Sequence, residues 1–346
     1  MANLSATSQE TDSADIPPKP PKPKTEHQIL AQWNSGPEDP LVTIQCITFN
    51  HRSFLDDAIN GFLMQETNFP FEILIHDDAS TDGTRELIEE YQAKYPRIIK
   101  TVLQSENQYS QGRRALSFLH HKSHGKYIAV CEGDDYWTDK KKLQIQVDFL
   151  ERHPDYVISG HDAFVIDENS KELTLSKLSN SHKKDYTGDE LSKSNALILT
   201  MSWVYRNIIP DFAPERNFVR NGDKFLISIL GRYGKSHFHD EIQPAAYRIH
   251  SGGVWSYSGS DSKLDDMINT LFWMYRYYKR KEEKELSAFY RKEFKRHVLQ
   301  KATFAELLKA FLSKLIFIER LKPLARKAIG ENKYRKIKKI VRNTIK

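Results

Sequence analysis

The first half of the chain alternates between short apolar runs and segments of mixed apolar and polar residues. The apolar runs, rich in Val, Ile, Leu and Phe, predict buried strands at 41–49, 71–76, 98–103 and 127–131. The mixed segments predict helices at 54–64, 85–95, 113–121 and 140–152. Strands that alternate with helices imply right-handed crossovers and a mostly parallel sheet with helices on both faces. The sequence therefore predicts an α/β fold.

The second half of the chain is less regular. Its pattern predicts a strand at 156–166, a buried segment at 196–205 and extended chain at 237–250. A helix is predicted to begin at Gly222 and to end at Gly231 or Gly234. From Asp261 the chain becomes helical, aromatic and basic, and apolar residues at three- and four-residue spacing predict an amphipathic helix over 304–316.

Polar clusters follow three of the predicted strands. They are Thr48–Asn50, Asp77–Ser80 and Glu132–Asp135. In parallel α/β sheets, ligands bind outside the carboxyl ends of the strands, near the point where the strand order reverses. We therefore expect the three clusters to lie on one edge of the sheet and to form a ligand site there.

Three carboxylates stand within four residues in the last of these clusters, Glu132–Asp135. Neighbouring carboxylates repel one another and need a cation or hydrogen-bond donors in order to coexist. Mg²⁺ and Mn²⁺ are bound by one or two carboxylates together with phosphate oxygens of a substrate. The cluster is thus a candidate site for Mn²⁺ or Mg²⁺, and an acidic turn that ends a strand is the structural alternative.

Composition and charge narrow the class of protein. The chain has 346 residues, of which 28% are charged, and no apolar run approaches the ~20 residues of a membrane-spanning helix. The N-terminus lacks the layout of a signal peptide, and Cys46 and Cys131 both fall in predicted strands rather than in a disulfide framework. We therefore expect a cytoplasmic protein.

The positive charge is concentrated at the C-terminal end. Residues 261–346 contain 24 Lys/Arg and 10 Asp/Glu, a net charge of +14, so the rest of the chain carries −8 of the total of +6. Such a region is suited to an anionic membrane surface, and no nucleic-acid-binding signature is present. We expect a disordered Pro/Lys-rich arm over 1–38, a catalytic domain over 39–260 and a basic helical extension over 261–346.

Two further motifs complete a recognisable set. They are Asn221-Gly222-Asp223 and the run Tyr247–Gly253. Together with the three strand-end clusters, in this order and at these spacings, they make residues 41–256 resemble the family 2 glycosyltransferases of GT-A fold. The resemblance implies a hexosyltransferase-like enzyme that transfers a sugar from a nucleotide-sugar donor, preferentially a UDP-sugar, with inversion at the anomeric carbon.

The resemblance also implies roles for individual residues. Asp223 takes the position of the catalytic base, where a carboxylate can remove the proton of an acceptor hydroxyl; a helix N-cap is the structural alternative. Asp134 and His250 take positions that contact the metal ion. The remaining donor-binding positions fall on Thr48, Asn50, Asp77, Asp78, Arg113, Glu132 and Asp135.

The implied acceptor is a glycan or a lipid-linked glycan, in the synthesis of a surface polysaccharide or lipopolysaccharide. The basic C-terminal region would then hold the enzyme peripherally on the inner face of the cell membrane. Two other functions stay open, a nucleotidyltransferase of a sugar-nucleotide pathway and a non-catalytic membrane-associated scaffold. His237 and His239 could share one face of a strand and bind zinc, but the sequence offers no third ligand in register.

Overall fold

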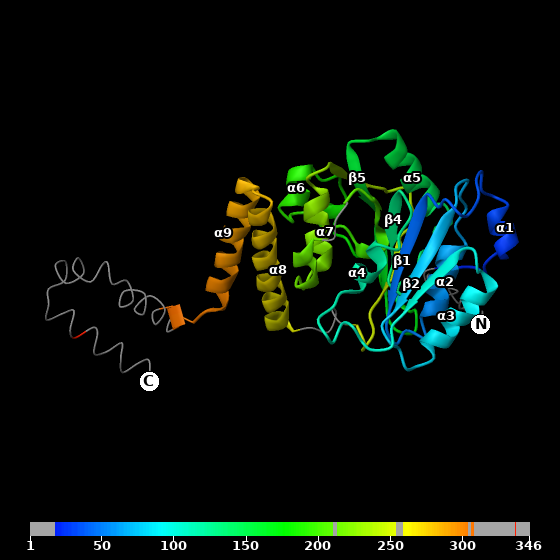
Figure 1. Cartoon of the computed structure of the whole chain (residues 1–346), viewed down its shortest axis with the longest axis horizontal. Coiled ribbons are helices and arrows are strands. Elements are labelled where there is room, and N and C mark those ends of the chain that lie inside the picture. The colour runs from blue at the N-terminus through cyan, green and yellow to red at the C-terminus, as the bar shows by residue number, and fades with distance from the viewer. Residues whose placement is uncertain (1–17, 210–212, 254–258, 304–305, 308–335, 337–346) are drawn as a thin grey trace, which may run out of the picture. The chain divides into compact units, whose positions relative to one another are not determined.

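The structure is a computed structural model that describes residues 18–209, 213–253, 259–303, 306–307 and 336 (Figure 1). These residues belong to two compact units, one that ends at Gly259 and one that begins at Ser260. The candidate site lies in the first unit.

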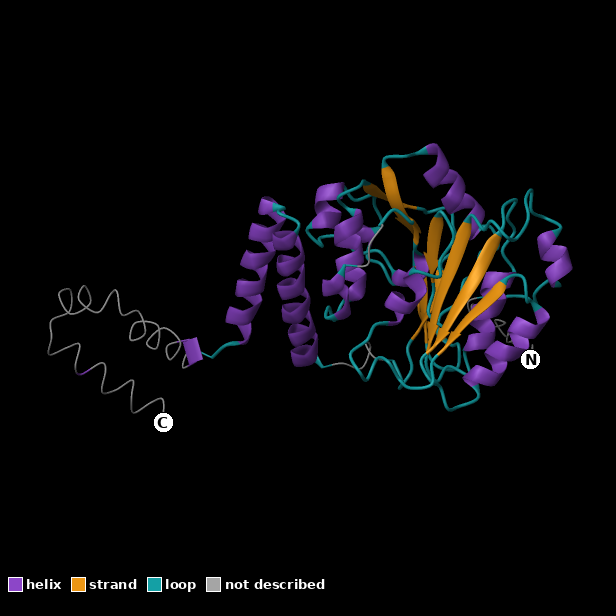
Figure 2. Ribbon diagram, viewed as in Figure 1, coloured by secondary structure: helices purple, strands orange, loops and turns teal. Residues whose placement is uncertain are grey.

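The first unit is built around a seven-stranded sheet of order β3-β2-β1-β4-β8-β5-β9 in the described residues (Figure 2). Within it only β8 runs antiparallel to its neighbours β4 and β5. A smaller sheet has the order β10-β6-β7. The strands are β1 Val42–Thr48, β2 Phe71–Asp77, β3 Ile99–Leu103, β4 Tyr127–Val130, β5 Tyr156–Gly160, β6 Ala163–Ile166, β7 Glu172–Thr174, β8 Val204–Arg206, β9 Lys235–Phe238 and β10 Ala245–Arg248. The mostly parallel sheet confirms the predicted α/β class.

Helices connect these strands. The α-helices of the first unit are α1 Glu26–Leu30, α2 Leu55–Leu63, α3 Thr84–Lys94, α4 Ala115–His120, α5 Lys142–Arg152, α6 Gly188–Ser192 and α7 Gly222–Leu230. Short 3₁₀ turns occur at η1 Asn180–His182, η2 Thr200–Ser202 and η3 Pro214–Asn217. The four helices predicted in the first half of the chain correspond to α2, α3, α4 and α5.

The central strand β4 is buried on both faces. Ala129 packs in the core that contains Phe62 of α2, whereas Ile128 packs in a second core with Leu226 of α7. Alternate residues of a strand point to opposite faces, so a strand between two cores must be apolar throughout. This explains why the run at 127–131 contains no charged side chain and why the first acid, Glu132, comes after the end of β4.

The predicted strand 156–166 is instead two strands in different sheets. β5 ends at Gly160 and β6 begins at Ala163, and the two buried residues between them form the bend. The Asp162 carboxylate accepts hydrogen bonds from the backbone N–H groups of Ala163 and Leu178, at 2.8 and 3.1 Å. These bonds hold the chain away from a continuous strand, which the apolar pattern alone does not reveal.

Part of the predicted disordered arm is folded. α1 begins with a capping box between Thr25 and Gln28, and Ile29 is fully buried in the main core. Tyr95 Oη donates a 3.0 Å hydrogen bond to the carbonyl of Lys24. The expectation of disorder is therefore wrong for residues 25–38, because α1 buries an apolar side chain on the domain. Residues 1–17 of the arm lie outside the described residues.

The second unit is a helical hairpin over its described residues. α8 Ser260–Arg280 and α9 Lys284–Lys301 pack against each other through stacked Tyr278 and Tyr290, whose ring centroids are 5.5 Å apart. Phe272 also meets Phe294, which fixes the two helices as antiparallel. Within the described parts of the chain, no helix has the length and apolarity that crossing a bilayer would require. Most of the predicted amphipathic helix 304–316 and of the basic run after 333 lies outside the described residues.

Candidate active site

The three polar clusters meet at one edge of the main sheet. Thr48 at the end of β1 is in register with Asp77 at the end of β2. The N–H of Gly133, just after β4, donates a 2.9 Å hydrogen bond to the carbonyl of Ile47. Thr48 Oγ1 is buried and has no hydrogen-bond partner within the described part of the chain. The strand ends therefore bring the predicted residues of all three clusters together.

The loop after β1 is fixed by the loop after β2. Asn50 adopts a left-handed conformation (φ 55°), which asparagine tolerates better than most residues. Its N–H donates to Ser80 Oγ at 2.8 Å, and its side-chain oxygen accepts from the N–H of Thr81 at 2.9 Å. The next residue, His51, donates its N–H to Thr84 Oγ1 at 3.0 Å. Asn50 thus holds the loop together through its backbone and its amide.

The two aspartates after β2 have different partners. Asp77 is fully buried and accepts hydrogen bonds from the hydroxyl and the N–H of Ser80. Asp78 accepts hydrogen bonds from the backbone N–H groups of Gln108 and Tyr109, at 2.7 and 3.0 Å. Both carboxylates therefore shape the loops around the sheet edge.

Arg113 belongs to the same side of the site as Asp78. Its guanidinium donates a 3.0 Å hydrogen bond to the side-chain oxygen of Gln108, the residue whose N–H binds Asp78. Arg113 also lines an open cleft of about 660 Å³ between α4 and η3, together with Phe118 and Phe218. Phe218 is 55% exposed, so the cleft offers an aromatic surface to solvent.

The carboxyl groups of the three acids after β4 have pKa values that differ from their ordinary values. Burial, followed by the charges of Asp134 and Asp223, raises the pKa of Glu132 to about 8. Burial, followed by the charges of Asp134 and Glu132, raises the pKa of Asp135 well above its usual range. Side chains in this condition are stabilised by a nearby cation, because a positive charge favours their ionised forms.

Asp134 is the member of this group that faces two histidines. Its Oδ2 lies 3.0 Å from His250 Nε2 and 3.8 Å from His51 Nε2. Burial alone would raise the pKa of Asp134, but the hydrogen bond from His250 and the charges of both histidines lower it. Burial lowers the pKa of His51.

The donor set of this cluster fits a divalent cation. His51, Asp134 and His250 each offer one ligand atom, and the three atoms lie within 4.8 Å of one another. Glu132, Asp134 and Asp135 form a second group of the same kind. Carboxylate and imidazole side chains are the usual protein ligands of Mn²⁺ and related ions. His51 is not among the site residues predicted from the sequence, although it directly follows the polar cluster Thr48–Asn50.

Hydrogen bonds from Arg248 to Asp135 and Asp134 connect the acidic loop after β4 to strand β10. Asp135 is buried and accepts a 2.8 Å hydrogen bond from the N–H of Arg248. The Arg248 guanidinium donates to the carbonyl of Asp134 at 3.0 Å and to Asp57 Oδ2 at 3.2 Å. Asp135 thus anchors β10 to the acid cluster, and the same strand leads to His250.

Asp223 approaches the cluster from α7. It lies in the first turn of the helix, after the N-cap Asn221, and its side chain is exposed. Its charge contributes to the raised pKa of Glu132, which places the two carboxylates near each other. The structure therefore brings the exposed carboxylate of Asp223 near Glu132.

We expect Gly133→Ala to destabilise the protein. A Cβ at Gly133 would lie 2.8 Å from Thr48 Oγ1 and 2.9 Å from Thr48 Cβ, which is closer than real contacts allow. Overpacking of this kind costs about 1–3 kcal/mol. Urea unfolding should report that loss. Gly222→Ala is the control, because nothing lies within 4 Å of its Cβ position; an equal loss in both variants would contradict the packing argument.

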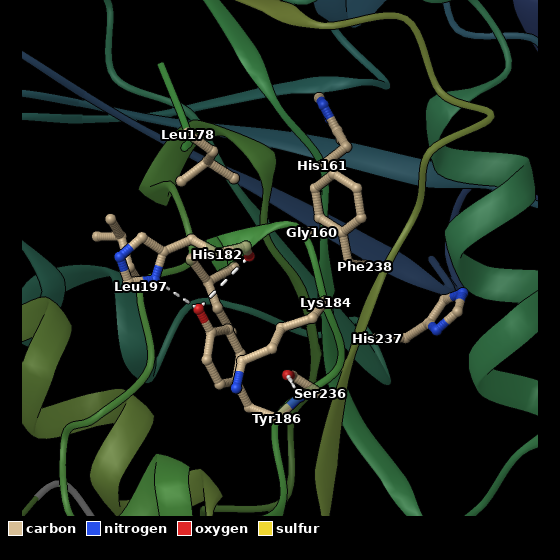
Figure 3. Close-up of a pocket in the computed structure, with 11 residues that line it drawn as sticks. Gly160, His161, Leu178, His182, Lys184, Tyr186, Leu197, Ser236, His237 and Phe238 are labelled. Atoms are coloured by element: carbon tan, nitrogen blue, oxygen red, sulfur yellow. Dashed lines mark hydrogen bonds between the residues drawn. The ribbon is translucent and has the colours of Figure 1, made fainter. Parts of the chain in front are cut away.

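A second hollow lies beside the ends of β5 and β9 (Figure 3). The rings of His182 and His237 lie on opposite sides of it, and His237 Nδ1 is 2.9 Å from Asp185 Oδ1. His239 Nδ1 contacts Glu241 Oε1 at 2.8 Å. Across the described ranges, groups of three potential metal ligands occur only around Asp134. The zinc alternative at His237 and His239 therefore finds no support in these ranges.

Comparisons with known proteins agree with this geometry. Residues 43–209 match the family described as Glycosyl transferase family 2. An uncharacterized protein of Mycobacterium tuberculosis is 35% identical over 225 residues, which cover 64% of this chain and 62% of that protein. EpsE of Bacillus subtilis, provisionally named a glycosyltransferase, is 36% identical over 137 residues, or 39% of this chain and 46% of EpsE. The chain thus spans less than two thirds of the length of these relatives.

Solved structures share the fold. The crystal structure of S. aureus TarS 1-349 in complex with UDP-GlcNAc aligns with a TM-score of 0.52 at 15% identity, over 84% of this chain and 80% of that chain. The complex of the same protein with UDP gives a TM-score of 0.52 at 16% identity, over 87% and 91% of the two chains. Identities this low establish a common fold and nothing further. The common fold confirms the predicted GT-A type architecture.

Proposed function

We propose that this chain, a member of glycosyl transferase family 2, transfers a sugar from a UDP-sugar to a hydroxyl acceptor, with inversion and with a divalent cation. The observation that supports this proposal best is the position of Asp223. Its exposed carboxylate lies near Glu132, beside the cluster formed by Asp134 and two histidines. A proton acceptor and a site for a diphosphate-bound cation are the two parts that direct displacement requires.

The donor nucleotide would bind at the ends of β1 and β2. Four residues surround this part of the edge, Thr48, Asn50, Asp77 and Asp78, and the Thr48 hydroxyl has no hydrogen-bond partner among the described residues. Arg113 borders the same loop through Gln108. UDP is our preferred nucleotide because TarS, which shares the fold, has been crystallised with UDP and with UDP-GlcNAc.

The diphosphate would lie next to Asp134, with His250 on the same carboxylate. Glu132 and Asp135 crowd two further carboxyl groups around that point, and their raised pKa values show that each loses its proton more readily when a cation is bound nearby. A divalent ion bound there supplies the neutralising charge for the departing diphosphate. We propose Mn²⁺ or Mg²⁺ in this role, on the basis of the carboxylate and imidazole donors.

The acceptor would approach from the side of α7. Asp223 is exposed, so an acceptor hydroxyl can reach its carboxylate and transfer its proton as the glycosidic bond forms. Because one base suffices for a single displacement, the configuration at the anomeric carbon inverts and no sugar becomes covalently attached to the protein.

The identity of the acceptor is a separate part of the proposal. The net charge of +14 over residues 261–346 supports an acceptor at an anionic membrane surface, such as a lipid-linked or surface glycan. The α8–α9 hairpin belongs to this basic region. We propose that the region binds peripherally to the inner face of the membrane and keeps the site near its acceptor.

Thermal unfolding with nucleotides provides the test. UDP and Mn²⁺ together should raise the midpoint of thermal unfolding more than either ligand does alone, because each is expected to bind the folded protein more tightly in the presence of the other. A ligand at 100 times its Kd adds about 2.7 kcal/mol to the free energy of unfolding. Asp134→Asn should abolish the increment that depends on Mn²⁺. The exposed Asp240→Asn should leave it unchanged. Stabilisation by ATP or GTP in place of UDP would instead favour a nucleotidyltransferase.

A further inference from the structure

The His51 imidazole lies in the candidate site, and neither of its ring nitrogens makes a hydrogen bond within the described residues. Its side chain is only 14% exposed. Nε2 lies 3.8 Å from Asp134 Oδ2, beyond hydrogen-bond length, and buried Nδ1 has no partner within the described ranges. A buried ring nitrogen without a hydrogen-bond partner costs free energy unless a ligand or water binds the ring.

The backbone around His51 fixes the position of the ring. Three successive N–H groups, those of Asn50, His51 and Arg52, donate hydrogen bonds to side chains of the 80–84 loop, at 2.8, 3.0 and 3.0 Å. The ring also packs near Phe54 and His250, with centroid distances of 6.3 and 5.6 Å. A side chain fixed in this way is suited to a ligand site, because little freedom remains to be lost on binding.

We propose that His51 is the third protein ligand of the divalent cation, beside Asp134 and His250, and that the site therefore prefers a first-row transition ion such as Mn²⁺ to Mg²⁺. The inference rests on the proposed function and goes beyond it. Both Nε2 atoms face the same Oδ2 of Asp134, and all three ligand atoms lie within 4.8 Å. Imidazole nitrogen suits transition ions, whereas Mg²⁺ strongly prefers oxygen ligands.

Binding of Mn²⁺ itself tests the proposal. The full-length chain is titrated with Mn²⁺ at saturating UDP, and free Mn²⁺ is measured by electron paramagnetic resonance. We expect His51→Gln to raise the Kd for Mn²⁺ by about tenfold or more, on the scale seen when groups that support metal sites are removed. The Kd for Mg²⁺, measured by competition, should change less, so the preference for Mn²⁺ narrows. His27→Gln is the control, since His27 is exposed on α1.

A spectroscopic measurement separates ligation from a structural role. Electron spin echo modulation of bound Mn²⁺ should show two coupled imidazole nitrogens in the unmodified protein and one in His51→Gln. The unmodified protein alone is informative, even if the variant folds poorly. A single coupled nitrogen there, or an unchanged Kd in a folded His51→Gln variant, overturns the proposal.

The outcome for Asp134→Asn distinguishes this inference from the proposed function. If Asp134→Asn abolishes Mn²⁺ binding while His51→Gln does not alter it, the metal-dependent function stands and His51 is no ligand. If neither variant alters Mn²⁺ binding, the cation is bound elsewhere. The proposed metal site and the inference about His51 then fail together.

Discussion

Asp223→Asn is expected to lower the rate of sugar transfer by about 10²–10⁴-fold, the usual contribution of a general base. The substitution keeps the shape of the side chain and removes its ability to accept a proton. The exposed position of Asp223 near Glu132 is where an acceptor hydroxyl would approach. The rate is measured with the UDP-sugar and acceptor that the unmodified protein uses, at saturating donor.

The same variant should still bind the donor. Asp223 lies on α7, whereas we assign the nucleotide to the ends of β1 and β2, so stabilisation by UDP with Mn²⁺ should stay within error of the unmodified protein. Loss of both transfer and UDP binding would indicate a structural role instead. Full activity of Asp223→Asn would show that another group removes the proton.

The chain offers a matched control for helix effects. α6 begins with Gly188-Asp189, just as α7 begins with Gly222-Asp223. Asp189→Asn removes a carboxylate from the first turn of a helix in the same way, which costs about 0.3–1 kcal/mol through the helix dipole. We expect Asp189→Asn to have that small effect on stability and none on transfer.

The sheet edge could be predicted because burial imposes a simple pattern on the central strands. Ile128 and Ala129 face different cores, so β4 has to be apolar along its whole length. The first acid, Glu132, therefore marks the point where the chain leaves the sheet. The same argument applies to Thr48 and Asp77, which end β1 and β2.

The contacts within the edge could not be predicted from the same pattern. His51 reaches Asp134 because Asn50 is left-handed and the 80–84 loop binds the backbone, through residues 30 to 33 positions away. Likewise, the carboxylate of Asp78 binds the backbone of Gln108, 30 residues later. Hydrogen bonds over such separations depend on loop conformations, and apolar periodicity contains no information about them.

Lys142 lies in the predicted helix 140–152, and the structure shows that its side chain is fully buried. Its ammonium group donates a 2.7 Å hydrogen bond to Gln146 Oε1 and lies 4.2 Å from the centre of the Trp137 ring. Burial lowers the pKa of Lys142 to about 7, against the smaller opposing effects of Cys131 and Asp139. A buried amine without a carboxylate partner is a cost to the folded state wherever it is protonated.

Lys142→Met is therefore expected to stabilise the protein near pH 7. Burying the charge costs on the order of 4 kcal/mol at that pH, from the difference between the folded pKa and the ordinary value. In the variant, Gln146 Oε1 loses its hydrogen-bond donor, which destabilises the folded state by about 1–3 kcal/mol and offsets part of the gain. The net gain in the free energy of unfolding should be about 1–3 kcal/mol, measured by urea unfolding.

The dependence on pH identifies the cause of that gain. Because the pKa of Lys142 is lower in the folded state, the unfolded chain binds more protons between pH 7 and the ordinary lysine pKa. The stability of the unmodified protein should therefore rise with pH in that window, by about 1.4 kcal/mol per unit more steeply than that of Lys142→Met. The exposed neighbour Lys141→Met should keep the unmodified slope. Parallel curves for Lys142→Met and the unmodified protein would mean that the buried amine keeps an ordinary pKa, and any gain in stability would then come from packing alone.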